Sequence, residues 1–279
     1  MNTLAYFTSE LSPEIFTLWG FTTRWYSLLF IMTFFCGFVL MKYFFLKEKQ
    51  NHEDVDILSL YVFLGTLIGA RLGHCLFYSP LHYLANPTEI LQVWKGGLAS
   101  HGGAIGILTA MWLYSKRNKK YPFIWIADRV VITVALGGLF IRIGNFFNSE
   151  IIGKPTDLPW AVIFTRIDNI PRHPAQLYEA IIYFCIFLLL LWIYKHKILP
   201  NTQQYLGLLF GLFMILVFTA RFGIEFLKEV QVSFESNMFL DMGQLLSIPF
   251  IVAGIIITKK ALNNEFLPKK NKHKQKHKS

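Results

Sequence analysis

The stretch YLGLLFGLFMILVFTARFGIEF, residues 205–226, decides the fold class of this chain. It carries only Arg221 and Glu225 as charged residues, and it is as long as the run of about 20 residues that a helix needs to cross a bilayer. Six further runs of similar character occur, and the seven together are 25–45, 57–78, 97–114, 124–146, 174–194, 205–226 and 242–258. The sequence therefore predicts an all-α, polytopic membrane helix bundle with seven transmembrane helices.

Composition and charge placement agree with this prediction. Hydrophobic residues make up 54% of the chain and charged residues 16%, whereas soluble proteins average about 25% charged residues. The net charge of +10 would suggest nucleic-acid binding in a soluble protein, but 17 lysines and arginines fall in one alternate set of loops and the tail, and 6 in the other set. Because positive residues concentrate on the cytoplasmic side, the N-terminus is predicted outside, the C-terminus in the cytoplasm, and nucleic acid is not an expected partner.

The cysteines and the N-terminal region exclude two common arrangements. Cys36, Cys75 and Cys185 all lie within apolar runs, so we expect neither disulfides nor a thiolate metal site, and interpret them as small core residues. No metal or cofactor is expected. The first apolar run follows acidic and polar residues and has no small-residue cleavage site after it, so we expect it to remain in the protein.

The chain is expected to have three parts. Residues 1–24 form an external arm, 25–258 form the membrane domain, and 259–279 form a basic cytoplasmic tail that is disordered and attracted to the anionic leaflet. Residues 147–173, the longest connection, form a small external head. We find no internal repeat of the kind common in secondary transporters.

Ionisable and polar side chains gather at the predicted outer ends of the spans. Such groups inside a membrane are costly and indicate a functional site. Arg142 and Asn145 lie three residues apart on one helical face, where a guanidinium can bind phosphate oxygens and Gly144 permits close approach. The alternative is that Arg142 is only a surface anchor. The group comprises Tyr26, His101, Arg142, Asn145, Glu150, His173, Glu179, Arg221 and Glu225.

Other polar residues have competing interpretations. Arg221 and Glu225 are four residues apart, so they could form an internal salt bridge, bind phosphate, or do both. Asp128 and Arg129, at an inner helix end, are read as snorkelling or a local ion pair.

The external start of the third span carries four glycines around His101, in residues 96–103. This composition favours close backbone approach over a regular helix. A lone histidine is more often structural, although its ordinary pKa suits proton abstraction from a thiol. Tyr26, beside Trp25, could belong to an aromatic belt.

Several motifs resemble, in order and along nearly the whole chain, those of the prolipoprotein diacylglyceryl transferase family. The run RIGNFFNSE at 142–150 matches the signature of that family, and the other matching runs are RWY at 24–26, GARLG at 69–73, 97–106, RHPAQLYE at 172–179 and MGQLLSIP at 242–249. The resemblance implies a seven-span bundle with a small periplasmic head in the bacterial inner membrane. One departure is Val217, where the family pattern has a tyrosine one turn before the arginine.

The resemblance also implies a reaction and a site. The family transfers a diacylglyceryl group from phosphatidylglycerol to the lipobox cysteine of prolipoprotein signal peptides and releases glycerol phosphate. Matched by motif, Arg142 binds phosphatidylglycerol, and Arg221 and His101 are important for activity. The remaining expected site residues are Tyr26, Gly102, Asn145, Glu150, Gly153 and Glu225.

Two other functions remain open from the residues alone. A transporter for an anionic solute would also use arginines, but its polar groups should lie near the midplane. A different lipid headgroup transferase would use the same phospholipid with another acceptor. Only the motif resemblance argues against the second alternative.

The charge bias generates a topology prediction. Reporter fusions at Asn118 and at the C-terminus should both read cytoplasmic, because the loops around them carry the larger share of the positive residues. Reporter enzymes that are active on only one side of the membrane make the measurement. A periplasmic signal at either position would overturn the orientation.

Overall fold

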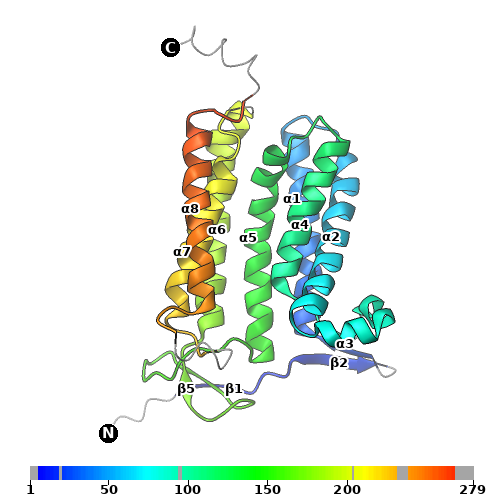
Figure 1. Ribbon diagram of the computed structural model, residues 1–279. Helices are drawn as coiled ribbons and strands as arrows, with labels where there is room; N and C mark the ends of the chain where they lie inside the picture. The colour runs from blue at the N-terminus through cyan, green and yellow to red at the C-terminus, as the bar shows by residue number, and fades with distance from the viewer. Residues whose placement is uncertain (1–5, 19–20, 94–95, 203, 231–237, 268–279) are drawn as a thin grey trace. The chain divides into compact units, whose positions relative to one another are not determined.

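The computed structural model describes residues 6–18, 21–93, 96–202, 204–230 and 238–267. It divides into two compact units (Figure 1): Met1–Gly37 with Asp128–Ser279 form the first unit, and Phe38–Ala127 form the second. The two boundaries fall inside long helices, α1 (Trp25–Lys47) and α5 (Phe123–Asn148).

Six of the described helices are long and apolar enough to cross a membrane. Their outer surfaces carry large exposed apolar side chains, such as Phe35 on α1 and Ile181 and Trp192 on α6, which suit contact with lipid rather than water. Helix α6 continues through the π-helical turn η3 (Tyr194–Ile198) into η4 (Leu199–Asn201). The six are α1, α2 (Asp54–Phe77), α5, α6 (Ala175–Ile193), α7 (Leu208–Glu225) and α8 (Met242–Leu262).

The third expected span differs from its prediction. Helix α4 (Ser100–Arg117) occupies most of 97–114 but is not among the six, since its sequence opens with Ser-His-Gly-Gly and ends with Lys-Arg. The expectation of irregular backbone around His101 is wrong from Ser100 onward, because this segment is the first turn of α4. The glycines serve close packing within regular helices instead.

Helices α2 and α4 pack through glycine in the second unit. A Cβ added at Gly106 would collide with the carbonyl oxygen of Gly65, and one added at Gly102 would collide with that of Gly69. Small residues at four-residue spacing let helix backbones approach in membranes, where packing rather than hydrophobic driving force holds helices together. Gly65, Gly69, Gly102 and Gly106 therefore form the contact surface that joins these two helices.

Arg71 organises the connection between α2 and α4, which includes α3 (Pro80–Ala85) and η1 (Pro87–Leu91). Its guanidinium donates to the carbonyl oxygens of Glu89, Ile90 (2.9 Å), Gly96 (2.6 Å) and Gly97 (3.3 Å). The Arg71 side chain is buried, and these carbonyls satisfy its charge.

Gly97 turns the chain into α4 with φ of +73°, a conformation that glycine adopts without strain. An added Cβ there would also meet the His74 ring at 2.6 Å. The turn therefore requires glycine for two independent reasons.

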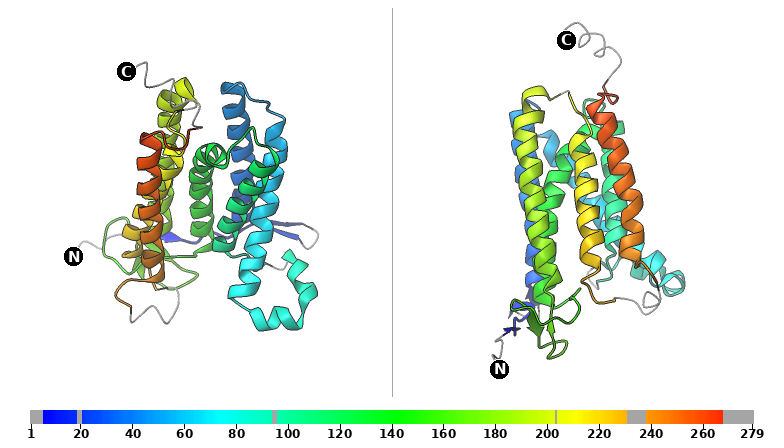
Figure 2. Two further views of the ribbon diagram at one scale, coloured as in Figure 1. Left: turned by 45° about the horizontal axis from the view of Figure 1, so that its top comes forward. Right: turned by 90° about the vertical axis from the view of Figure 1, so that its left-hand side faces the viewer.

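In the first unit, α7 packs against both α6 and α8, as Figures 1 and 2 show. Gly211 of α7 and Gly254 of α8 bring the two backbones together, since a Cβ on Gly254 would lie 2.9 Å from the Gly211 carbonyl oxygen. Phe218 and Phe250 stack beside them, with ring centroids 4.4 Å apart. Asp241 caps α8 by accepting from the Gln244 backbone N–H at 2.9 Å.

A buried carboxylate fixes the start of α7. Asp128 of α5 accepts hydrogen bonds from the backbone N–H groups of Gly207 (2.7 Å) and Phe210 (2.9 Å), so it caps a different helix from its own. Asp128 and Arg129 are both fully buried, with 3.9 Å between charged atoms. The local ion pair predicted for them is confirmed, and snorkelling is wrong.

The arm and the head form β-structure, which the all-α prediction did not include. Strand β1 (Phe7–Ser9) pairs in parallel with β4 (Val162–Phe164), which pairs antiparallel with β5 (Pro171–Arg172). Phe146, Val162 and Phe164 form a small core beneath this sheet. A separate hairpin, β2 (Glu14–Leu18) with β3 (Phe21–Arg24), leads into α1. Short segments outside the long helices thus gain order by pairing across a large sequence separation.

Arg172 fastens the head to the end of α7. It donates to both carboxylate oxygens of Asp168 and, at 2.7 Å, to Glu229, and it also reaches the Gly153 carbonyl. These hydrogen bonds from Arg172 hold the pKa of Asp168 below its ordinary value, and they raise the pKa of Arg172. The contact between Arg172 and Asp168 therefore adds to the free energy of unfolding at pH values above the ordinary pKa of an aspartate. This contribution is lost as the pH falls through the lowered pKa of Asp168.

The C-terminal end of α8 and one of the cysteines also differ from expectation. Helix α8 extends to Leu262, past the expected span end at residue 258, so residues 259–262 are helical rather than disordered. Residues 268–279, which hold most of the expected basic tail, lie outside the described residues. Of the cysteines, Cys75 is buried and Cys36 half-buried, but Cys185 is exposed, so it is not a core residue.

The glycine contact surface between α2 and α4 generates a stability prediction. Gly106→Ala should lower the melting temperature of the purified protein, because the added methyl forces the helices apart at a cost of about 1–3 kcal/mol. Thermal unfolding in detergent measures it. Gly223→Ala on α7 is the matched control: its added methyl meets nothing within 4 Å, so stability should hold or rise. Equal melting temperatures for the two variants would contradict the close packing.

Candidate functional site

The polar residues of the first unit meet where α5 and α7 end and α6 begins. Arg142 and Asn145 come from the last turns of α5, Glu179 from the first turns of α6, and Arg221 and Glu225 from the last turns of α7. Lys228 follows three residues after Glu225. Short loops and the head hold these helix ends together, so charged groups far apart in sequence become neighbours.

Arg142 and Asn145 share one face of α5, as predicted. The Arg142 guanidinium donates to the Asn145 amide oxygen at 3.3 Å, and the Asn145 amide donates to Glu150 at 3.0 Å. Asn148 donates to the other Glu150 oxygen at 3.2 Å. Asn145 is buried, and its hydrogen bonds with Arg142 and Glu150 fix the orientation of its amide. These contacts order the signature run 142–150 into one polar surface.

Glu179 is the charge partner of Arg142. Glu179 is buried, and its Oε2 lies 3.0 Å from Arg142 Nε, the distance of an ion pair. That oxygen nevertheless accepts no hydrogen bond of good geometry from the described residues. Arg142 is therefore neutralised by a carboxylate without being rigidly bonded to it.

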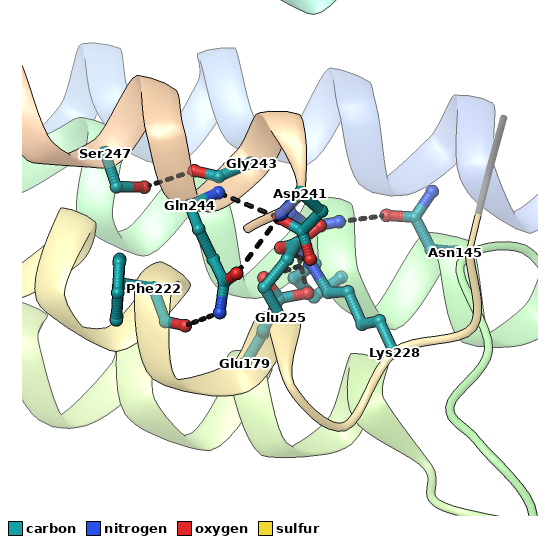
Figure 3. Close-up of polar contacts among 10 residues, drawn as sticks. Asn145, Glu179, Phe222, Glu225, Lys228, Asp241, Gly243, Gln244 and Ser247 are labelled. Carbon is teal, nitrogen blue, oxygen red and sulfur yellow. Dashed lines mark hydrogen bonds and ion pairs between the residues drawn. The ribbon is translucent and has the colours of Figure 1, made fainter. Parts of the chain in front are cut away.

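Lys228 links two carboxylates (Figure 3). Its ammonium group donates to Glu179 Oε1 at 3.1 Å and to Glu225 Oε2 at 3.0 Å, and the lysine is buried. Glu225 also packs against Gly243 of α8, where an added Cβ would lie 2.6 Å from the carboxyl carbon. The predicted pair between Arg221 and Glu225 is not formed, because Lys228 takes the place of Arg221 as the partner of Glu225.

Arg221 retains an unused donor. Its Nε is buried and has no hydrogen-bond partner among the described residues. The Tyr183 ring of α6 lies within electrostatic reach of both Arg142 and Arg221, and it packs on Gly138 of α5. Arg221 therefore has a donor available for a ligand.

Tyr26 packs against α5, the helix that carries Arg142 and Asn145. Its ring lies against Gly144, where an added Cβ would be 2.8 Å from Cδ2 of Tyr26. Trp25 instead stacks on Phe147, with 4.9 Å between ring centroids. Gly144 therefore permits the close approach of Tyr26.

Gly153 lies where the head crosses the end of α7. Its N–H donates to the His173 carbonyl at 3.0 Å, and an added Cβ would collide with that carbonyl and approach the Leu227 carbonyl to 2.9 Å. The adjoining Gln176 donates to the Glu150 carbonyl at 2.6 Å. Gly153 thus holds the head close to the polar surface through its backbone.

His101 and Gly102 belong to the second unit, whereas the residues described above belong to the first. His101 is exposed in the first turn of α4, and Gly102 is buried against the backbone of Gly69. The close contact of Gly102 with Gly69 shows that the packing of α4 on α2 requires glycine at this position. No group of three or more metal-ligating side chains is found among the described residues.

Glu179 and Lys228, which contact the charged residues described above, were not among the predicted site residues. Glu179 was assigned to the same outer level and lies in the matched run 172–179, but it was not selected as a site residue. Lys228 was counted only as an external positive charge. Its spacing of three residues after Glu225, just beyond an apolar run, was the available signal for an ion pair.

Comparison with known proteins identifies the family. The family model described as prolipoprotein diacylglyceryl transferase matches residues 13–259. A phosphatidylglycerol–prolipoprotein diacylglyceryl transferase from Tolumonas auensis is 48% identical over 88% of this chain and 93% of its own length. Proteins of the same name from Chloroherpeton thalassium and Porphyromonas gingivalis are 47% and 42% identical, over 92% and 96% of this chain and 95% and 99% of their own lengths. The motifs quoted from the sequence, the paired arginines at the helix ends and these matches lead to one conclusion: the chain belongs to the prolipoprotein diacylglyceryl transferase family.

Proposed function

We propose that this membrane transferase moves the diacylglyceryl group of phosphatidylglycerol onto the thiol of a lipobox cysteine in a prolipoprotein, the first step of lipoprotein maturation. The relatives named above support the activity and both substrates. The observation that carries the assignment to this site is the buried Nε of Arg221, which has no hydrogen-bond partner among the described residues and lies near the end of α7, as Arg142 lies near the end of α5. The transporter alternative is set aside, because the relatives are transferases.

The two arginines fit the change of charge during the reaction. The substrate sulfur attacks the glyceryl carbon that bears phosphate, a C–S bond forms, and the C–O bond breaks with its electron pair passing to the phosphate oxygen. The phosphodiester carries one negative charge, while the released glycerol phosphate approaches two. Arg142 and Arg221 would therefore bind the transition state more strongly than the ground state.

The neighbouring polar groups suit the headgroup of phosphatidylglycerol. Asn148 Oδ1 and Gln176 Oε1 are buried and accept no hydrogen bond from the described residues. A glycerol headgroup supplies two hydroxyl donors, which match unpartnered acceptors better than an ammonium headgroup does. Tyr26, Asn145, Glu150 and Gly153 would shape this region, and Glu225 would support it through Lys228.

His101 is proposed to accept the proton of the substrate thiol. A histidine with an ordinary pKa can do so near neutral pH. An arginine-lined site could also lower the thiol pKa enough for water to take the proton. Loss of activity in His101→Ala that is restored at higher pH would favour the histidine.

The orientation is proposed from charge placement. We place the arm, the head and the arginine site on the periplasmic side, α4 as the seventh span, and the basic C-terminus in the cytoplasm. The six candidate spans support a multi-pass membrane protein.

The assay that tests the function uses purified protein, labelled phosphatidylglycerol and a peptide with a lipobox cysteine. The expected product is a thioether-linked lipid on the peptide together with glycerol phosphate. A lipid-modified product lacking the thioether, or transfer to a different acceptor alone, would overturn the proposal.

Arg142→Ala should abolish transfer while the protein still accumulates in the membrane. The lost phosphate contacts are charge-assisted hydrogen bonds worth about 1.5–3 kcal/mol each, so activity should fall at least tenfold. Arg142→Lys should recover only part of it, since lysine lacks the bidentate fork. Arg117→Ala, at the exposed end of α4, serves as the control. Normal turnover of Arg142→Ala would show that this arginine is a surface anchor.

Replacement of Cys36, Cys75 and Cys185 together by alanine should leave transfer intact, because the substrate supplies the nucleophile. Cys75 lies one turn from Arg71, but that guanidinium is engaged by backbone carbonyls and does not need a thiolate partner. Cys75 is also buried, so a lipid substrate has little access to its sulfur. Mass spectrometry of the wild-type enzyme checks for a lipid-linked intermediate. One trapped on Cys75 would require a two-step covalent route.

A further inference from the structure

Four charged side chains form a continuous chain across the ends of three helices. Glu225 contacts Lys228, Lys228 contacts Glu179, and Glu179 lies beside Arg142, with separations of 3.0, 3.1 and 3.0 Å. Glu179 and Lys228 are both almost fully buried. Positive and negative groups alternate, so each buried charge is neutralised by a neighbour.

This arrangement poses a problem for phosphate binding at Arg142. In the described structure the charge of Arg142 is already opposed by Glu179. A phosphate that binds Arg142 must compete with that carboxylate. If Arg142 turned toward phosphate, a buried Glu179 without another partner would be strongly unfavourable.

The geometry at Glu179 resolves the problem. Lys228 bonds to Oε1 and Arg142 lies beside Oε2, so the two cations use different oxygens of one carboxylate. The Lys228 contact is a formed hydrogen bond, while Oε2 accepts none from the residues that the structure describes. Glu179 can therefore lose Arg142 and remain paired.

We infer that Lys228 is a positioning residue for the transfer reaction: it keeps Glu179 neutralised when Arg142 exchanges that carboxylate for the phosphate of phosphatidylglycerol. This inference rests on the proposed function. Glu225 holds Lys228 from the other side and fixes where its ammonium group stands. Lys228 contacts no reacting atom in this role, and it acts through Glu179 on the availability of Arg142.

The test distinguishes neutralisation of Glu179 by Lys228 from a purely structural role of Lys228. Lys228→Met should raise the KM for phosphatidylglycerol roughly tenfold or more, as expected when a buried charge loses its partner, with a smaller change in kcat. Lys228→Arg should restore most of the affinity, because it keeps the charge. Combining Lys228→Met with Glu179→Gln should also recover affinity, because the carboxylate that needs compensation is gone.

Lys154→Met is the matched control. Lys154 is a nearby exposed lysine whose ammonium donates to the Phe226 carbonyl at 3.0 Å rather than to a carboxylate. The KM of Lys154→Met for phosphatidylglycerol should therefore equal that of the wild-type enzyme. Thermal stabilisation by phosphatidylglycerol vesicles provides a second, activity-independent measure of binding for all variants.

Two outcomes overturn the inference. One is a normal KM in Lys228→Met; the other is a double variant that binds phosphatidylglycerol no better than Lys228→Met. If Lys228→Met does not accumulate, the decisive comparison is made within the Glu179→Gln background, where the inference expects Lys228→Met to have little effect on KM and a large effect overturns it. Absence of transfer by the wild-type enzyme would instead overturn the proposed function itself.

Discussion

The requirement that every buried charge has a partner organises the polar part of this protein. In a membrane, an unpaired arginine or glutamate cannot rely on water, so the helix ends must bring opposite charges together. Arg142, Glu179, Lys228 and Glu225 meet this requirement with side chains from three helix ends. Because each residue neutralises another, the positions of α5, α6 and α7 at this level are interdependent.

The same constraint acts differently elsewhere in the chain. Arg71 satisfies its charge with backbone carbonyls, so it holds a loop and has no donor reserved for an anion. Asp128 satisfies its charge with the backbone N–H groups of another helix. Arg221, in contrast, keeps a buried Nε that has no hydrogen-bond partner within the described part of the chain. The satisfied groups maintain architecture, and the unsatisfied donor is the reason for proposing Arg221 as a ligand-binding residue.

Hydropathy and charge spacing predicted much of the fold from the sequence. Six of the seven expected runs correspond to helices that meet the length and apolarity needed for a span. The head sheet was not predicted, because β1 and β4 are three residues each and pair across most of the chain, too far apart for local patterns to reveal. The start of helix α4 was predicted as irregular backbone because of its glycines. These glycines lie in a regular helix and make its contact with α2.

The candidate site was predictable where local spacing determines the contact. Arg142 and Asn145 share a helical face by virtue of their three-residue separation, and the structure confirms their hydrogen bond. Of the alternatives left open for Arg221 and Glu225, the direct ion pair is not formed, since a four-residue spacing permits such a pair but does not require it. Lys228, beyond the end of the helix, reaches both Glu225 and Glu179, a choice that depends on how α6 approaches α7.

The parallel pairing of β1 with β4 has a consequence for the order of folding. Ribosomes synthesise the N-terminus first, yet β1 has no strand to join until residues 162–164 emerge, after α1, α2, α4 and α5 have been made. Closing so long a loop costs chain entropy that local contacts do not repay, so this sheet should form late. Strand β1 must therefore remain unpaired until the head that completes its sheet has been made.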